Sequence, residues 1–184
     1  MSGISDEEIV TLFNDSFEKE RAFTLLVKKY QERLYWHCRK LVLNHEDADD
    51  ALQNTMVKVW KNLDTFRGDS SLFTWIFRIA TNESLTLLRT RKRHDLKINS
   101  DQDFESNLSE SLEADPYFDG NEAQLKLQKA VLALPEKQRL VFNMKYFDEM
   151  RYEDISAILT TSVGALKASY HHAVKKIEKF LEDE

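Results

Sequence analysis

One segment of the chain, Ser100–Asn121, lacks the periodicity of three to four residues that runs through most of the remaining sequence. Its sequence SDQDFESNLSESLEADPYFDGN mixes Ser, Asp, Glu and Asn with one Pro and one Gly. Segments of this composition cannot bury enough apolar surface to form a core. We therefore expect an acidic flexible linker over residues 100–121, joining an N-terminal domain (residues 1–99) to a C-terminal domain (residues 122–184).

Both flanking parts are predicted to be helical, because Gly (4) and Pro (2) are scarce among the 184 residues. In the N-terminal part, Ser5–Glu8 (SDEE) is a capping box that opens a first helix. Asn44 is the expected cap of the third helix, and Ser70 or Ser71 that of the fourth. The predicted inward stripe of the second helix is Phe23, Leu26, Tyr30, Leu34, Cys38 and Leu41. The stripe of the third helix is Ala48, Leu52, Met56, Val59 and Leu63. The stripe of the fourth helix is Leu72, Ile76, Ile79, Ala80 and Leu87.

The C-terminal part has four shorter helical patterns and no alternating strand pattern, so the predicted fold class is all-α with two small helical domains. The first helix is expected over residues 122–134, and Pro135 suits the first position of a second helix over residues 136–147. Two further helices meet at the turn Thr160–Ser162, where Ser162 can cap the longer one. Its predicted inner stripe is Leu166, Tyr170, Val174 and Ile177. This pattern fits a helix-turn-helix and, equally, an ordinary helical hairpin.

The outer face of the last helix favours a role in DNA binding. Gly164, Ala165, Ala168, His171, His172 and Lys175 lie on or beside the side opposite the inner stripe. Small side chains let a helix approach base edges closely. The adjacent pair His171–His172 also raises the possibility of a metal site, but two helical ligands need a spacing of four. We therefore expect neither a metal site nor a cofactor.

The formal charge of −6 does not exclude a nucleic-acid partner, because residues 100–121 hold seven acidic residues and no basic one. The two flanking parts are close to neutral. The sequence has no apolar run long enough for a membrane span and no signal peptide, so we expect no direct membrane insertion. With Cys38 as its single cysteine, the chain suits the cytoplasm. It contains no G-x-S-x-G, P-loop or H-E-x-x-H motif, so we expect no enzymatic activity.

Two further stretches are candidate binding sites. His45–Asp50 (HEDADD) is an acidic helix start, which is either a solvated first turn or a docking surface for a basic partner. Arg89–His94 (RTRKRH) closes a helix that carries Phe73, Trp75 and Phe77 near its start. Aromatic rings followed by a basic end suit single-stranded nucleic acid. The alternative is that the cations cap the helix and the aromatic residues are core, and we expect at least one of the three rings to be buried.

Three stretches together resemble bacterial sigma factors of the extracytoplasmic-function (ECF) group: DADDALQ…W, FRGDSSLFTWIFRIATN and LPEKQRLVF. The resemblance spans nearly the whole chain except the linker. It implies a transcription initiation factor that binds core RNA polymerase and directs it to promoter DNA. Region two of the family, here within residues 1–99, would bind polymerase and help open the −10 element. Region four, here within residues 122–184, would recognise the −35 element.

The resemblance also implies which residues act. Core polymerase would bind Asp47, Asp50, Gln53 and Asn54. The −10 element would contact Phe66, Arg67, Gly68, Asp69, Ser70, Ser71, Trp75, Asn82, Arg89, Arg91 and Arg93. The −35 element would contact Lys167, Ala168, His171, His172 and Lys175. The acidic linker would follow a basic polymerase channel, whereas a solvated tether is the simpler alternative. An anti-sigma factor, possibly anchored in the membrane, is a further implied partner.

The sequence departs from the family pattern at a few positions. The family often has Gly in the turn where this chain has Thr160, and DGLSYEEIA where this chain has DEMRYEDIS, Asp148–Ser156. It often has arginines at the positions of Ser169 and His172. Two alternative functions remain open from the sequence. One is a DNA-binding regulator that acts without polymerase, and the other is a sigma-factor mimic that sequesters a regulator.

Overall fold

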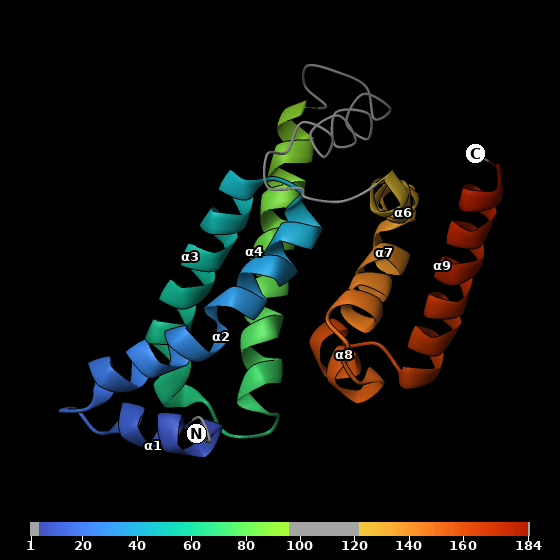
Figure 1. Ribbon diagram of the computed structural model, residues 1–184. Coiled ribbons are helices and arrows are strands. Elements are labelled where there is room, and N and C mark those ends of the chain that lie inside the picture. Colours follow the sequence, from blue (N-terminus) through green and yellow to red (C-terminus); the bar gives the residue numbers. More distant parts are fainter. Residues whose placement is uncertain (1–3, 96–121, 184) are drawn as a thin grey trace.

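The computed structural model describes residues 4–95 and 122–183, and these residues form helices and connecting turns without a β-strand. The predicted linker, residues 100–121, lies outside the described residues. The N-terminal helices are α1 (Asp6–Asn14), α2 (Lys19–Val42), α3 (His45–Asn62), a short 3₁₀ turn η1 (Leu63–Thr65) and α4 (Leu72–Asp95). The C-terminal helices are α6 (Glu122–Leu132), α7 (Glu136–Phe142), a π-helical turn η2 (Asn143–Phe147), α8 (Tyr152–Leu159) and α9 (Val163–Asp183). The all-α prediction is confirmed (Figure 1).

Side-chain caps start three of the N-terminal helices as the sequence predicts. Ser5 Oγ accepts from Glu8 N (3.1 Å), and the Glu8 carboxylate accepts from Ser5 N (2.8 Å), so the capping box of α1 is complete. Asn44 Oδ1 accepts from Asp47 N (2.7 Å) at the start of α3. Of the two serines proposed for α4, Ser71 is the cap, since its Oγ accepts from Thr74 N (3.1 Å). These bonds satisfy amide groups that have no partner within the helix.

The predicted inward stripes hold best on α2, where all six residues except the half-buried Phe23 are buried. On α3 the buried side is rotated, because Ala51 and Thr55 are buried while Leu52 and Met56 are half-buried. Thr55 tolerates this position since its hydroxyl donates to the Ala51 carbonyl (2.6 Å). Pro135 precedes α7 as its N-cap residue instead of occupying the first helical position.

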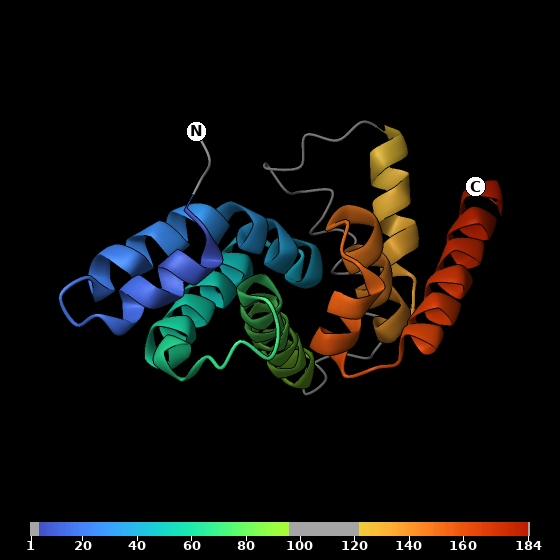
Figure 2. The same cartoon turned by 90° about the horizontal axis from the view of Figure 1, so that it is seen from below.

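The N-terminal and C-terminal helices pack against each other, a contact that no sequence pattern indicated. α8 lies beside α4, and η2 lies against α2 (Figures 1 and 2). A single cluster of buried apolar side chains includes Ile76 and Phe77 of α4 together with Ile155 and Ile158 of α8. A smaller cluster joins α6, α7 and α9 through Ala130, Val131, Leu134, Phe142, Ala173 and Ile177. The burial of Phe77 confirms that one of the three aromatic residues of α4 belongs to the core.

Candidate nucleic-acid interface

The helix-turn-helix consists of α8, the turn Thr160–Ser162 and α9. Thr160 ends α8 in the left-handed conformation, with φ 53° and ψ 46°. Ser162 then begins α9, because its Oγ accepts from Ala165 N (3.3 Å). Leu166 and Ile177 are buried as predicted, Tyr170 and Val174 are half-buried, and Ala173 is a buried residue that the predicted stripe omitted.

The opposite face of α9 is free of large apolar residues over its first three turns. All members of the predicted set are exposed: Gly164, Ala165, Lys167, Ala168, His171, His172 and Lys175. The ring centroids of His171 and His172 lie 6.0 Å apart, and the two ring planes are inclined by 56° to each other. This face therefore has small residues at its start, which would let the helix approach base edges closely, and hydrogen-bonding and cationic residues further along.

Lys167 lies at the flank of this face, with its Nζ 5.8 Å from the centre of the Tyr152 ring on α8. Lys145 Nζ lies over the same ring at 4.9 Å and also donates to the Met150 carbonyl (3.1 Å). Two lysines from different elements therefore converge on one tyrosine. The sequence did not point to Lys145, because no spacing rule relates η2 to α9.

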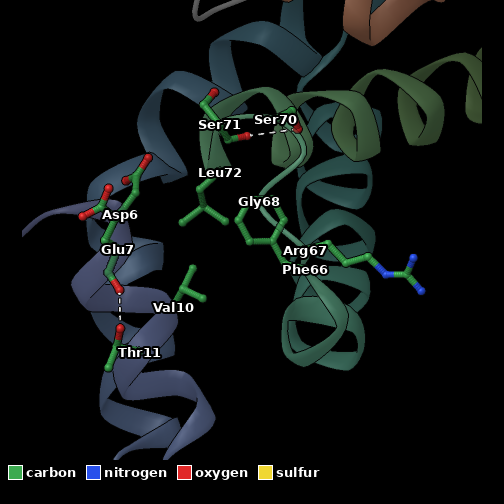
Figure 3. A pocket seen from close by; sticks show the side chains of 10 residues that line it. All are labelled: Asp6, Glu7, Val10, Thr11, Phe66, Arg67, Gly68, Ser70, Ser71 and Leu72. Atoms are coloured by element: carbon green, nitrogen blue, oxygen red, sulfur yellow. Dashed lines mark hydrogen bonds between the residues drawn. The ribbon is translucent and has the colours of Figure 1, made fainter.

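A second candidate surface surrounds a cavity of about 590 Å³ between α1 and the loop that precedes α4 (Figure 3). Five of the six predicted loop residues line it, namely Phe66, Arg67, Gly68, Ser70 and Ser71. Asp69 does not line the cavity. The Arg67 side chain points away from the α1 residues, toward solvent. Gly68 has φ 78°, a conformation that a side chain would strain, so glycine suits this loop.

The opposite wall of the cavity belongs to α1 and was not predicted. It comprises Asp6, Glu7, Val10 and Thr11. Asp6 is held in place, since its carboxylate accepts from Lys29 Nζ (2.7 Å) and from the Tyr30 hydroxyl (2.6 Å). Burial, with this hydrogen bond, raises the pKa of Tyr30, so its hydroxyl keeps its proton and donates. No sequence signal links α1 to the loop, because the two meet only in the folded chain.

Trp75 is half-buried, and its ring lies 5.5 Å from that of Phe66, which places an aromatic pair at the edge of the loop. Further along α4, Asn82, Arg89 and Arg93 are exposed. Arg91 is half-buried and donates to Asp47 on α3 (3.1 Å). The predicted phosphate contact Arg91 and the predicted polymerase contact Asp47 therefore bind each other in the folded chain. Arg89 lies 3.7 Å from Glu136, a contact between exposed side chains.

The outer face of α3 presents the remaining predicted polymerase contacts. Asp50, Gln53 and Asn54 are exposed, whereas Asp47 is partly covered by Arg91. Val57 continues this face one turn further and is 50% exposed. The exposure of Val57 was not predicted from the sequence, because a single apolar residue among polar ones belongs to no periodic pattern. Within residues 4–95 and 122–183, no helix is long and apolar enough to cross a membrane.

Comparisons with known proteins agree with this arrangement. Sigma-70 region 2 matches residues 26–94, and Sigma-70 region 4 matches residues 124–177. The RNA polymerase sigma-H factor of Pseudomonas aeruginosa is 29% identical over 173 residues, covering 89% of this chain and 88% of that protein. The ECF RNA polymerase sigma factor SigW of Bacillus subtilis is 28% identical over 169 residues, covering 88% and 90%.

The fold is also that of solved sigma factors. The sigma factor RpoE of Bartonella quintana, solved with the anti-sigma factor NepR, superposes with a TM-score of 0.69 at 24% identity, covering 87% of this chain and 96% of that one. The two family matches together span well over half of the sequence. The first covers most of α2 together with α3 and α4, and the second runs from α6 into α9 and includes the helix-turn-helix. The chain therefore belongs to the sigma-70 family, in its extracytoplasmic-function group, and is a transcription initiation factor that directs core RNA polymerase to promoter DNA.

Proposed function

We propose that three surfaces divide the work of initiation. The outer face of α9 recognises the −35 element, the cavity with the exposed strip of α4 holds the −10 element, and the outer face of α3 binds core polymerase. We further propose residues 1–99 and 122–184 as the two functional domains, with residues 100–121 as the acidic linker, and the cytoplasm as the site of action. The observation that carries the proposal is the α9 face, which is exposed and holds no acidic residue between Gly164 and Lys175.

Two contacts of different kinds are expected on α9. Lys167 lies on the flank, so it suits a phosphate, and a lysine that contacts a phosphate contributes about one unit to the salt dependence of binding. His171 lies on the outer face, where its ring nitrogens suit a base edge. Replacing a base contact costs about 1–3 kcal/mol at the preferred base and relaxes the preference there.

Binding of the full-length protein, with core polymerase, to −35 promoter variants across salt concentrations tests both contacts. Lys167→Ala is expected to weaken binding to all sequences and to lower the salt slope, whereas His171→Ala is expected to relax selectivity at one position. Lys176→Ala is the matched control, since Lys176 is exposed on α9 outside the proposed set. If both variants behave like Lys176→Ala, α9 does not recognise the −35 element.

The cavity beside the loop is proposed to receive a base flipped from the −10 element. Extruding a base costs a few kcal/mol, so stacking and hydrogen bonds in the cavity must offset that free energy. The half-buried Phe66 ring offers a stacking surface, and Asp6 and Ser71 offer acceptors for base amino groups. Asn82, Arg89 and Arg93 would then contact the strand along α4. Arg91 would reach a phosphate only by leaving Asp47.

Control by an anti-sigma factor is proposed by analogy with RpoE of Bartonella quintana, whose structure contains NepR. Such a partner would cover the polymerase-binding surface until a signal releases it. Affinity purification of the tagged protein from unstressed cells is expected to recover a stoichiometric partner other than polymerase. Recovery of core polymerase alone would contradict this form of control.

A further inference from the structure

The two adjacent histidines of α9 lie on opposite sides of the line that faces outward. Successive residues of an α-helix are rotated by about 100° about its axis. Gly164, Ala168 and Lys175 therefore lie close to one line along the exposed face. His171 projects to one side of that line and His172 to the other, and both rings are exposed. Each histidine thus belongs to a different flank of the same face.

The two flanks differ in the charges that they present to a DNA groove. The same rotation places Lys167 on the flank of His171. Between Gly164 and Lys175, the flank of His172 otherwise has only Ala165 and the half-buried Ser169. A helix in the major groove has a sugar–phosphate strand on each side. Lys167 is the proposed phosphate contact on one side, so His172 is the group placed to meet a phosphate on the other.

His172 has no counter-charge within the described residues. Over residues 4–95 and 122–183, its ring makes neither a hydrogen bond nor an ion pair, and its neighbouring ring is that of His171. The nearest charged residues along α9 are Lys175 and Lys176, three and four positions further on. The first acidic residue of the helix is Glu178, which lies six positions away. The side chain is therefore available to an anion from outside the protein.

The elements packed against α9 do not supply a counter-charge either. They are α6, α7 and α8, and their acidic residues are Glu122, Glu136, Glu153 and Asp154. Asp154 pairs with Arg151 (3.0 Å), and Glu136 lies 3.7 Å from Arg89. The basic residues of α6 and α7 are Lys126, Lys129, Lys137 and Arg139. Burial raises the pKa of both Tyr152 and Tyr170, so these hydroxyls stay neutral near pH 7.

A phosphate contact favours the charged form of an imidazole. In water an imidazole is half protonated near about pH 6.5, so it is mostly neutral above pH 7. A phosphate oxygen accepts hydrogen bonds, and a charged donor binds it more strongly than a neutral one. Related sequences often have arginine where this chain has His172, and arginine stays charged throughout this pH range. This chain therefore has a titratable group where a permanent cation is common.

We propose that His172 contacts a phosphate of the −35 DNA as an imidazolium, on the flank opposite Lys167, so that promoter binding takes up a proton. The inference rests on the proposed recognition of the −35 element by α9. Because the complex then holds more protons than the separate components, affinity rises as the pH falls. The protein would thus bind its promoters more tightly at mildly acidic pH than at alkaline pH.

The size of the effect follows from counterion release. One phosphate contact releases about 0.9 of a counterion, which corresponds to about five-fold in affinity at 0.15 M salt. Because a free imidazole is already partly protonated at pH 6, the expected gain from pH 8 to pH 6 is about four-fold. The slope of log affinity against log salt should also be steeper at pH 6, by about 0.7.

Binding of the full-length protein, with core polymerase, to a −35 promoter fragment between pH 6 and pH 8 tests this contact. Polymerase has titratable groups of its own, so each variant is compared with the wild-type protein at the same pH. His172→Gln should match the wild-type affinity at pH 8 and fall about four-fold below it at pH 6. His172→Arg should retain the tight binding and the steep salt slope at both pH values. His171→Gln, which removes the neighbouring ring, should keep the pH dependence.

The outcomes separate this inference from the function on which it rests. Proton uptake at His172 is overturned if the affinity of His172→Gln relative to the wild-type protein is the same at every pH. It is equally overturned if His171→Gln, and not His172→Gln, abolishes the pH dependence. If Lys167→Ala still weakens binding in either case, recognition of the −35 element by α9 stands. If Lys167→Ala also binds like the wild-type protein at every salt concentration, the proposed function of α9 fails as well.

Discussion

Replacing Thr160 with glycine is expected to stabilise the protein. Thr160 has φ 53° and ψ 46° between α8 and α9, in the left-handed region where a β-carbon crowds the following carbonyl. That conformation costs an L-residue about 1–2 kcal/mol, and a β-branched residue is especially unsuited to it. Glycine also lowers the free energy of unfolding by about 0.5–1 kcal/mol, because it has more conformational freedom to lose on folding. The net expectation is a stabilisation of about 0.5–1 kcal/mol.

The side chain of Thr160 is exposed, so its removal sacrifices little buried surface. Thermal unfolding followed by circular dichroism measures the effect. A gain of 1 kcal/mol shifts Tm by about 2–4 °C when 150–250 residues unfold together, and by about 4–8 °C when 60–100 residues unfold alone. Because the apolar cluster spans α4 and α8, we expect the smaller shift. The size of the shift therefore reports whether the two sets of helices unfold as one unit.

Two further variants separate strain from other effects. Thr160→Ala removes the β-branch but retains the β-carbon, so its Tm should lie between those of the wild-type protein and Thr160→Gly. Glu149 has the same φ of 53° and is exposed, so Glu149→Gly should also raise Tm. Backbone strain at Thr160 is contradicted if Thr160→Gly lowers Tm, or if Thr160→Ala stabilises the protein as much as the glycine variant does.

Three other predictions concern function and reactivity. Asp50→Lys should weaken binding to core polymerase in a pull-down with purified components, whereas Glu20→Lys, an exposed reversal on α2, should not. Phe66→Ala should slow promoter opening measured by permanganate footprinting, since stacking on an aromatic ring is worth about 1–3 kcal/mol per base, and Phe17→Ala, at a ring 96% exposed, should leave opening unchanged. Burial raises the pKa of Cys38 to about 11, so alkylation at pH 8 should be at least about 100-fold slower in the folded protein than in urea, and equal rates would contradict its burial.

Local sequence signals predicted the helix starts and the exposed α9 face. Ser5, Asn44 and Ser162 cap helices through bonds to amides three residues away, so short stretches determine them. The departures from the family pattern were equally informative. At Glu149 and Thr160, where related sequences often carry glycine, the backbone has positive φ. These two departures from the family pattern thus coincide with positions of positive φ, although neither the helical patterns nor the resemblance had predicted strain there.

Contacts between distant elements could not be predicted, because a periodic pattern shows that a face is buried without showing what covers it. The α1 wall of the cavity and the bond between Arg91 and Asp47 are both of this kind. The interface between α2 and the C-terminal helices is another. His37 and Asp148 are polar residues that belong to no predicted inward stripe, yet both side chains are almost fully buried, and they bind each other through Nδ1 and the carboxylate at 2.6 Å.

The two-sided burial of α4 limits which residues can meet a promoter strand. Thr81 and Ser84 are polar by sequence but buried, since their hydroxyls donate to the carbonyls four residues earlier, at 2.7 Å and 2.9 Å. With Ile76, Phe77 and Ala80 also buried, packing occupies most of the circumference of the helix. The exposed positions Asn82, Thr86, Arg89 and Arg93 recur at steps of three or four, so they form one stripe about 16 Å long. Asn82, Arg89 and Arg93 lie on this exposed stripe, whereas Arg91 is paired with Asp47, so these three residues are the stronger candidates for contacting the −10 element.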